Sequence, residues 1–181
     1  MTQANHAIFG RPMGSPAPQG FEEVVLGMGC YWGVERLFWE QDGVWLTEVG
    51  FAGGTAANPT YRQVCNGGTG HAEVVRVVYD PSRISFEQIL KIFWENHNPT
   101  QGNRQGNDVG DQYRSVIYTT TASQQADAER SRIDYNNRLA VAGHPEITTV
   151  IQPLDRFWIA PELEHQQYLH KVPNGYCPHH S

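Results

Sequence analysis

The sequence has few charged side chains and almost no lysine. Charged residues make up 18% of the 181 positions, against about 25% in an average soluble domain. Lys91 and Lys171 are the only lysines, and the formal net charge is −6. Proteins that hold nucleic acid through its phosphates need an excess of basic side chains. The composition therefore predicts no nucleic-acid partner.

Long hydrophobic runs are also missing. No apolar segment approaches the roughly 20 residues that a membrane-spanning helix requires. The first ten residues, MTQANHAIFG, lack the basic and then apolar pattern of a secretory leader. We therefore expect a cytoplasmic protein with no membrane partner.

Cysteine is scarce, and its number is odd: Cys30, Cys65 and Cys177. A small disulfide-stapled domain carries more cysteines, usually in even number. The three spacings include no Cys-x-x-Cys, which excludes a zinc ribbon. A tail cluster of Cys177, His179 and His180 lacks a fourth metal ligand. We expect no metal and no cofactor, and free or catalytic thiols in a reducing compartment.

What the chain does contain is the apolar content of one folded domain, with 39% hydrophobic residues. Residues 1–20 hold three prolines and three glycines and predict an irregular arm. Residues 21–181 predict a single catalytic domain that ends in an irregular tail. Between 23 and 119 the patterns alternate as strand, helix, strand, strand, helix, strand. This order predicts an α+β, ferredoxin-like (split βαβ) two-layer sandwich with its helices on one face and with extra helices.

The strongest helix signal lies at Ser85, which with Gln88 forms a capping-box pattern before an apolar stripe from Phe86 to Trp94. Thr121 opens a second helix to about Leu139. Residues 53–71 and 97–112 predict two long polar loops. Residues 147–153 predict a strand, and 161–171 a short helix.

Cys30 lies where the first strand meets the first helix, in Gly29-Cys30-Tyr31-Trp32-Gly33. The positive end of a helix dipole and its unpaired N–H groups favour a thiolate, the nucleophilic form. A buried, inert cysteine is the alternative. Tyr31 and Trp32 are either core residues or the apolar wall of a pocket.

Glu73 opens an apolar strand in Gly70-His71-Ala72-Glu73. A buried glutamate has a raised pKa and can donate a proton near neutral pH. A glutamate at a sheet edge facing solvent is an equal alternative. His71 is a weaker acid–base candidate.

The two predicted loops and the tail offer further polar groups. Asp108 and Tyr113, and Tyr61 in the first loop, could hydrogen-bond a small polar ligand. The alternatives are an Asx-turn for Asp108, a half-buried strand position for Tyr113 and ordinary turn packing for Tyr61. Cys177 lies in a terminal segment that suits a resolving thiol, or it is incidental. Cys65 belongs to no motif and is interpreted as structural.

Five motifs together resemble the peptide methionine sulfoxide reductase A family. They are Gly29–Gly33, Thr69–Glu73, Asp108–Ser115, Gln166–Leu169 and Gly175–Cys177, and the resemblance runs from about residue 24 to 177. Residue 31 is Tyr where the family usually has Phe.

The resemblance implies reduction of methionine S-sulfoxide, free or in oxidised proteins, to methionine. It implies that Cys30 attacks the sulfoxide sulfur while Glu73 protonates the oxygen. It places Tyr61, Asp108 and Tyr113 on the oxygen, and Tyr31 and Trp32 on the S-methyl group. Cys177 then resolves the sulfenic acid of Cys30, and thioredoxin reduces the resulting disulfide. We expect a monomer.

Two other classes of function remain possible when the residues alone are considered. A cysteine hydrolase or acyltransferase would pair Cys30 with His71 or His97. An aromatic-lined binding module would need no thiol chemistry at all.

Overall fold

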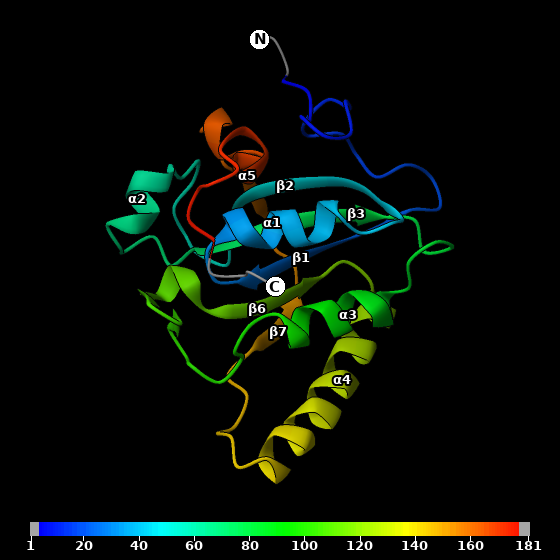
Figure 1. Ribbon diagram of the computed structural model, residues 1–181, viewed down its shortest axis with the longest axis vertical. Helices are drawn as coiled ribbons and strands as arrows, with labels where there is room; N and C mark the ends of the chain where they lie inside the picture. The colour runs from blue at the N-terminus through cyan, green and yellow to red at the C-terminus, as the bar shows by residue number, and fades with distance from the viewer. Residues whose placement is uncertain (1–3, 178–181) are drawn as a thin grey trace.

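A computed structural model describes residues 4–177 of the chain. Its sheet strands and helices are shown in Figure 1. In chain order the elements are β1 (Glu22–Met28), α1 (Tyr31–Trp39), β2 (Val44–Ala52), α2 (Tyr61–Cys65), β3 (Ala72–Tyr79), α3 (Phe86–Glu95), β4 (Arg104–Gln105), β5 (Asp108–Val109), η1 (Asp111–Tyr113), β6 (Ser115–Thr119), α4 (Ala122–Val141), β7 (Val150–Pro153), β8 (Phe157–Ile159), η2 (Leu163–His165) and α5 (Tyr168–Lys171).

Six strands form the main sheet in the order β7-β6-β1-β3-β2-β8. The neighbouring strands are antiparallel except β6 and β7, which are parallel. β1 and β3 occupy the centre, and both are almost entirely buried. The predicted mixture of helices with a β-sheet is confirmed.

One face of the sheet carries the larger part of the core. Leu26 of β1 and Val75 of β3 belong to the same buried cluster as Val34 of α1, Phe93 of α3 and Ala128 of α4. Figure 1 shows α1 lying over the sheet, with α3 and α4 beside β6 and β7. Burying these side chains stabilises the fold by about 25 cal/mol for each Å² of apolar surface that is removed from water.

The local signals for α3 and α4 are confirmed. Ser85 and Gln88 make both hydrogen bonds of a capping box at the start of α3. The Thr121 side chain accepts a hydrogen bond from the Gln124 N–H at the start of α4. Each cap satisfies N–H groups that have no partner within the helix.

The N-terminal arm is irregular but is anchored to the fold. His6 is buried, and its Nδ1 accepts the N–H groups of Ile8 and Phe9 at 3.0 and 3.1 Å. The ring proton therefore lies on Nε2, which donates to Thr47 Oγ1 at 2.8 Å, and the Thr47 hydroxyl donates to Glu35 at 2.6 Å. This chain of bonds ties the arm to β2 and α1.

A second polar cluster holds the arm against the sheet. Arg76 of β3 pairs with Glu48 at 2.8 Å and Glu23 at 2.7 Å, and it donates to the Ser15 carbonyl at 3.0 Å. The Glu48 side chain is 2% exposed. A buried carboxylate of this kind requires its cation, because an unpaired buried charge is strongly unfavourable.

Several local predictions were wrong. The predicted loop 53–71 contains α2, and 97–112 contains β4, β5 and part of η1. The single predicted helix over 161–171 is interrupted, because Gln167 adopts a left-handed conformation with φ of 51° between η2 and α5. The short edge strand β8 was not predicted.

No helix within residues 4–177 is long and apolar enough to cross a membrane.

Candidate active site

Cys30 is held at the junction of β1 and α1. Gly29 turns the chain with φ of +96°, a left-handed conformation that suits glycine. Cys30 is then the N-cap residue of α1 without a side-chain cap hydrogen bond, although the backbone N–H of Trp32 is near enough to its sulfur to favour the thiolate. The residue is only 6% exposed. The predicted position at a helix N-terminus is confirmed.

The expectation that this position favours a thiolate was wrong. Burial raises the pKa of the Cys30 thiol well above its usual value, and the nearby Glu73 carboxylate raises it further. The Trp32 N–H acts in the opposite direction but is outweighed. Moving the thiolate charge from water into this interior costs more free energy than the N–H groups at the start of the helix return.

Glu73 is the buried acid at the start of β3. It is 1% exposed, so the solvent-facing alternative was wrong. Its Oε1 accepts the Tyr31 N–H at 3.1 Å, while Oε2 has no hydrogen-bond partner among the described residues. Burial raises the pKa of Glu73 to about 8, in spite of the Tyr31 hydrogen bond, and Asp108 adds to the rise. At neutral pH this carboxyl group is mostly protonated.

Buried polar atoms without partners gather around this acid and thiol. In the part of the chain that the structure describes they are Trp32 Nε1, Glu73 Oε2, Asp108 Oδ2 and Glu162 Oε2. Asp108 acts electrostatically on both Glu73 and Cys30, and Glu162 acts on Tyr31. An unsatisfied buried polar atom costs about 1–3 kcal/mol. Such a concentration is typical of a site that completes its hydrogen bonds with a ligand.

Aromatic rings from three segments close one side of the site. Trp32 stacks on Tyr168 with ring centroids 4.1 Å apart and on Tyr61 at 6.4 Å. His165 meets the ring of Tyr61 edge-on at 4.4 Å. The Tyr61 N–H donates to Glu162 Oε1, which joins α2 to the segment before η2. The ring faces of this aromatic wall are apolar, and the ring edges carry polar atoms. Such a surface suits a small ligand that has both an apolar and a polar part.

The tyrosine that replaces the family's usual Phe is fully buried. The Tyr31 hydroxyl lies 2.7 Å from Nδ1 of His165. Burial raises the pKa of the phenol, and Glu73 raises it further, whereas burial lowers the pKa of His165. The phenol therefore stays protonated and donates to the neutral imidazole, so the additional hydroxyl has a partner.

Asp108 and Tyr113 reach the site from the second predicted loop. Asp108 Oδ1 accepts the Tyr176 hydroxyl at 3.2 Å. Tyr113 lies at the end of η1 and is half-buried, and its pKa is raised by burial and then by Glu73. Two loops far apart in sequence thus bring Tyr61, Asp108 and Tyr113 to the same acid.

The other two cysteines are also placed differently from expectation. Cys177, predicted to lie in an open terminal segment, is 4% exposed, and its sulfur accepts a hydrogen bond from Arg36 at 3.1 Å. Cys65, interpreted as structural, is exposed at the end of α2, and its pKa is raised by partial burial in spite of the nearby Tyr61 hydroxyl, which lowers it. All three thiols are free.

Neither histidine proposed for a cysteine hydrolase is available to Cys30. His71 uses Nδ1 for the Gly54 N–H at 3.0 Å and Nε2 for the Ala56 carbonyl at 2.7 Å. His97 is held by the Phe93 carbonyl at 2.6 Å and by Ser115 Oγ at 2.7 Å. With both ring nitrogens bound elsewhere, neither imidazole can take a proton from the thiol.

The described residues form no candidate metal site. Over 4–177 no group of three or more His, Cys, Asp or Glu residues could hold a metal ion. His179 and His180, named with Cys177 as a tail cluster, lie outside these residues.

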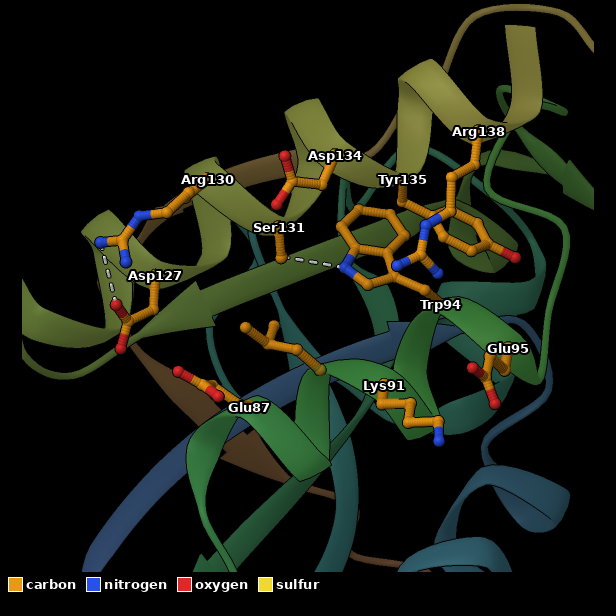
Figure 2. Close-up of a pocket in the computed structure, with 11 residues that line it drawn as sticks. Glu87, Lys91, Trp94, Glu95, Asp127, Arg130, Ser131, Asp134, Tyr135 and Arg138 are labelled. Carbon is orange, nitrogen blue, oxygen red and sulfur yellow. Dashed lines mark hydrogen bonds and ion pairs between the residues drawn. The ribbon is translucent and has the colours of Figure 1, made fainter. Parts of the chain in front are cut away.

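A groove between α3 and α4 is separate from this site. Figure 2 shows Trp94 of α3 donating to Ser131 of α4, with charged side chains along both helices. The groove is lined by residues of α3 and α4, from Glu87 to Glu95 and from Asp127 to Arg138. None of the residues around Cys30 and Glu73 contributes to it.

Sequence reasoning missed Glu162 and His165 as residues of the site, and it missed Arg36 as the hydrogen-bond partner of Cys177. Tyr168 and Tyr176 were noticed only as parts of motifs. Gln166-Gln167-Tyr168-Leu169 and Gly175-Tyr176-Cys177 were the available signals. Nothing local distinguishes Arg36 or Glu162 from an ordinary surface charge.

Comparison with known proteins agrees with this arrangement. Residues 22–181 match the family described as peptide methionine sulfoxide reductase. The peptide methionine sulfoxide reductase MsrA of Pseudomonas aeruginosa (strain UCBPP-PA14) is 58% identical over 172 residues, which are 95% of this chain and 80% of that protein.

Two solved proteins share the fold along most of the chain. Methionine sulfoxide reductase A of Corynebacterium diphtheriae superimposes with a TM-score of 0.90 at 50% identity, covering 99% of this chain and 87% of that one. Mxr1 of Saccharomyces cerevisiae in reduced form gives 0.84 at 32% identity, covering 92% and 94%. Mxr1 has also been solved in complex with Trx2, where identity is 21% and the TM-score 0.63. The chain belongs to the peptide methionine sulfoxide reductase family.

Proposed function

We propose that this protein reduces methionine S-sulfoxide, free and in oxidised proteins, to methionine. The observation that carries the proposal is a thiol and a protonated carboxyl group buried together at the junction of β1, α1 and β3. Peptide methionine sulfoxide reduction needs both, since the sulfoxide oxygen leaves only when it is protonated.

In the first step Cys30 attacks the sulfoxide sulfur and Glu73 supplies a proton to the oxygen. The oxygen passes to the Cys30 sulfur, methionine is released, and the proton that the Cys30 thiol loses restores the Glu73 carboxyl group. One thiol and one sulfoxide thus become one sulfenic acid and one thioether, the first reversible step of cysteine oxidation. The pKa of about 8 keeps Glu73 protonated at neutral pH, where this step must run.

Substrate binding follows from the unsatisfied atoms. Glu73 Oε2 and Asp108 Oδ2 have free hydrogen-bonding capacity, and the Tyr61 and Tyr113 hydroxyls hold their protons because burial raises both pKa values. We assign these four groups to the sulfoxide oxygen, directly or through water. Trp32 and Tyr31 are assigned to the S-methyl group.

Recycling would use the second buried thiol. Cys177 attacks the sulfenic sulfur of Cys30, water leaves, and a Cys30–Cys177 disulfide forms. We propose thioredoxin as the reductant, acting by thiol–disulfide exchange. Yeast Mxr1, 32% identical to this chain, is itself known in complex with Trx2.

We also infer that the domain over residues 21–181 is built around a split βαβ core. The four central strands β6, β1, β3 and β2 are antiparallel neighbours. α1 connects β1 to β2, and α3 lies between β3 and β6 in the chain. β7 and β8 would then be additions at the two edges of this core.

Thiol counting in a single turnover tests the proposed function. We expect one equivalent of methionine S-sulfoxide to consume two thiols, mapped to Cys30 and Cys177, with Cys65 left free as an internal reference. The R epimer should not react. Cys30→Ser should form no methionine even with dithiothreitol, and methionine formation by that variant would refute the assignment.

Cys177→Ser separates the two halves of the cycle. It should still form one equivalent of methionine but should not turn over with thioredoxin as reductant. Full thioredoxin-driven turnover would remove Cys177 from the mechanism.

A further inference from the structure

The thiol of Cys177 rests against a cation on α1. Arg36 Nη2 donates to Cys177 Sγ at 3.1 Å, and the cysteine is almost completely buried. Tyr176, the preceding residue, donates its hydroxyl to Asp108. The described part of the tail (172–177) is therefore held at two adjacent residues, one over the loop that carries Asp108 and one over α1.

Arg36 lies on the same helix that begins at Cys30. Arg36 lies six positions after Cys30, which corresponds to a rise of roughly 9 Å along the helix axis. Cys177 is close enough to Cys30 to affect its ionisation, and Cys30 in turn affects the ionisation of Tyr176. The Arg36 contact thus places the second thiol near the first while both are reduced.

Arg36 forms no ion pair with an acidic side chain among the described residues. Across residues 4–177 the arginine ion pairs of the structure are those of Arg76, Arg83 and Arg130, and none includes Arg36. A cation beside a thiol favours the thiolate, which is the attacking form. A guanidinium also presents its donors in a fixed plane, whereas an ammonium group does not.

We propose that Arg36 is a positioning residue for the resolving step: it holds the Cys177 sulfur near Cys30 and stabilises negative charge on it as it attacks. This inference rests on the proposed function, in which Cys177 resolves the sulfenic acid. The Arg36 side chain donates its hydrogen bond to the Cys177 sulfur, and we assign it no contact with the substrate.

The step balances in atoms and electrons. The Cys177 sulfur forms a bond to the Cys30 sulfur, and the S–O bond of the sulfenic acid breaks. The departing hydroxide takes the proton that Cys177 releases and leaves as water. A disulfide needs sulfurs about 2.05 Å apart, so the Cys177 sulfur exchanges its Arg36 hydrogen bond for the new bond.

Rapid-quench kinetics of Arg36→Met and Arg36→Lys test the proposal. With one equivalent of methionine S-sulfoxide, both variants should form methionine at the wild-type rate. Disulfide formation should slow about tenfold in Arg36→Met, equivalent to ~1.4 kcal/mol. The Cys30 sulfenic acid should then accumulate and be trapped by a dimedone reagent. Arg36→Lys, which keeps the charge but not the planar group, should fall between the two.

Rescue by the conservative variant provides a readout that a packing role would not change. If Arg36 acts through the hydrogen bond that its cationic group donates to the Cys177 sulfur, Arg36→Lys should restore part of the rate of disulfide formation that Arg36→Met loses. Arg130→Met on α4, whose exposed side chain pairs with Asp127, is the matched control and should behave as wild type.

The outcomes separate this inference from the function on which it rests. Wild-type disulfide formation in Arg36→Met, with none in Cys177→Ser, overturns the role of Arg36 and leaves the reductase intact. A Cys30 disulfide that forms in Cys177→Ser overturns the resolving role itself. Equal slowing of methionine and disulfide formation in Arg36→Met would make Arg36 merely structural.

Discussion

Glu73 should make the fold less stable as pH rises, and Glu73→Gln should remove that dependence. The carboxyl group titrates at about 8 in the folded protein, against a reference value of 4.5. Its pKa is raised on folding, so its contribution is fully present below pH 4.5 and is lost as pH rises towards 8. Between these values the folded state binds more protons than the unfolded state.

The magnitude follows from the size of the shift. Each pKa unit is worth about 1.4 kcal/mol of difference between the two states. Relative to pH 4, the wild type should lose up to about 3 kcal/mol by pH 7 and up to about 5 kcal/mol by pH 9 through this one group. A glutamine of the same shape keeps an oxygen for the Tyr31 N–H and never ionises.

Urea unfolding of both proteins at pH 5, 7 and 9 measures the effect. The variant should gain stability relative to the wild type with each increase in pH, while losing sulfoxide reduction because an amide is not a useful acid. Titrating groups that Glu73 does not influence act equally in both proteins and cancel in the difference. A difference in unfolding free energy that stays constant from pH 5 to pH 9 would refute the raised pKa and, with it, the account of Glu73 as the proton donor.

Three further outcomes are expected. The single-turnover rate of methionine formation should decline as pH rises through about 8, because Glu73 loses its proton there, and a stopped-flow profile that rises throughout would contradict this. Tyr31→Phe should stay active but lose about 0.5–1.5 kcal/mol of stability with the His165 hydrogen bond; equal thermal unfolding would show that the bond contributes nothing. Arg76→Met should cost about 3–5 kcal/mol, since it leaves Glu48 buried without its cation, whereas Arg83→Met, at an exposed pair, should change the unfolding free energy by less than about 1 kcal/mol.

Local patterns predicted the elements whose stability is local. α3 has its capping box and apolar stripe within ten residues, and β1 and β3 are short apolar runs that remain strands when buried on both faces. α2 also carries a capping box, formed by Thr60 and Gln63. Its signal was overlooked within a segment dominated by glycine.

Non-local contacts decide the elements that were missed. β8 has only three residues, and it exists because Gly50 of β2 lets the chain approach: a side chain there would lie 2.3 Å from the Trp158 carbonyl. The break at Gln167 follows from its bonds to Glu35, at 2.7 Å from its N–H and 2.9 Å from its side chain. No window of sequence contains both partners of either contact.

By itself the sequence determined the chemistry available to this protein: a cysteine at the start of a helix, a glutamate at the start of an apolar strand, a second cysteine near the end, and the motifs that carry the family resemblance. Only the tertiary structure decided the protonation states, because the cost of a charge depends on burial by residues distant in the chain. It buried Glu73 and Cys30 together, which left the acid protonated and the thiol neutral. It also brought Arg36 to Cys177 and His165 to Tyr31, contacts across 141 and 134 positions that no spacing rule connects.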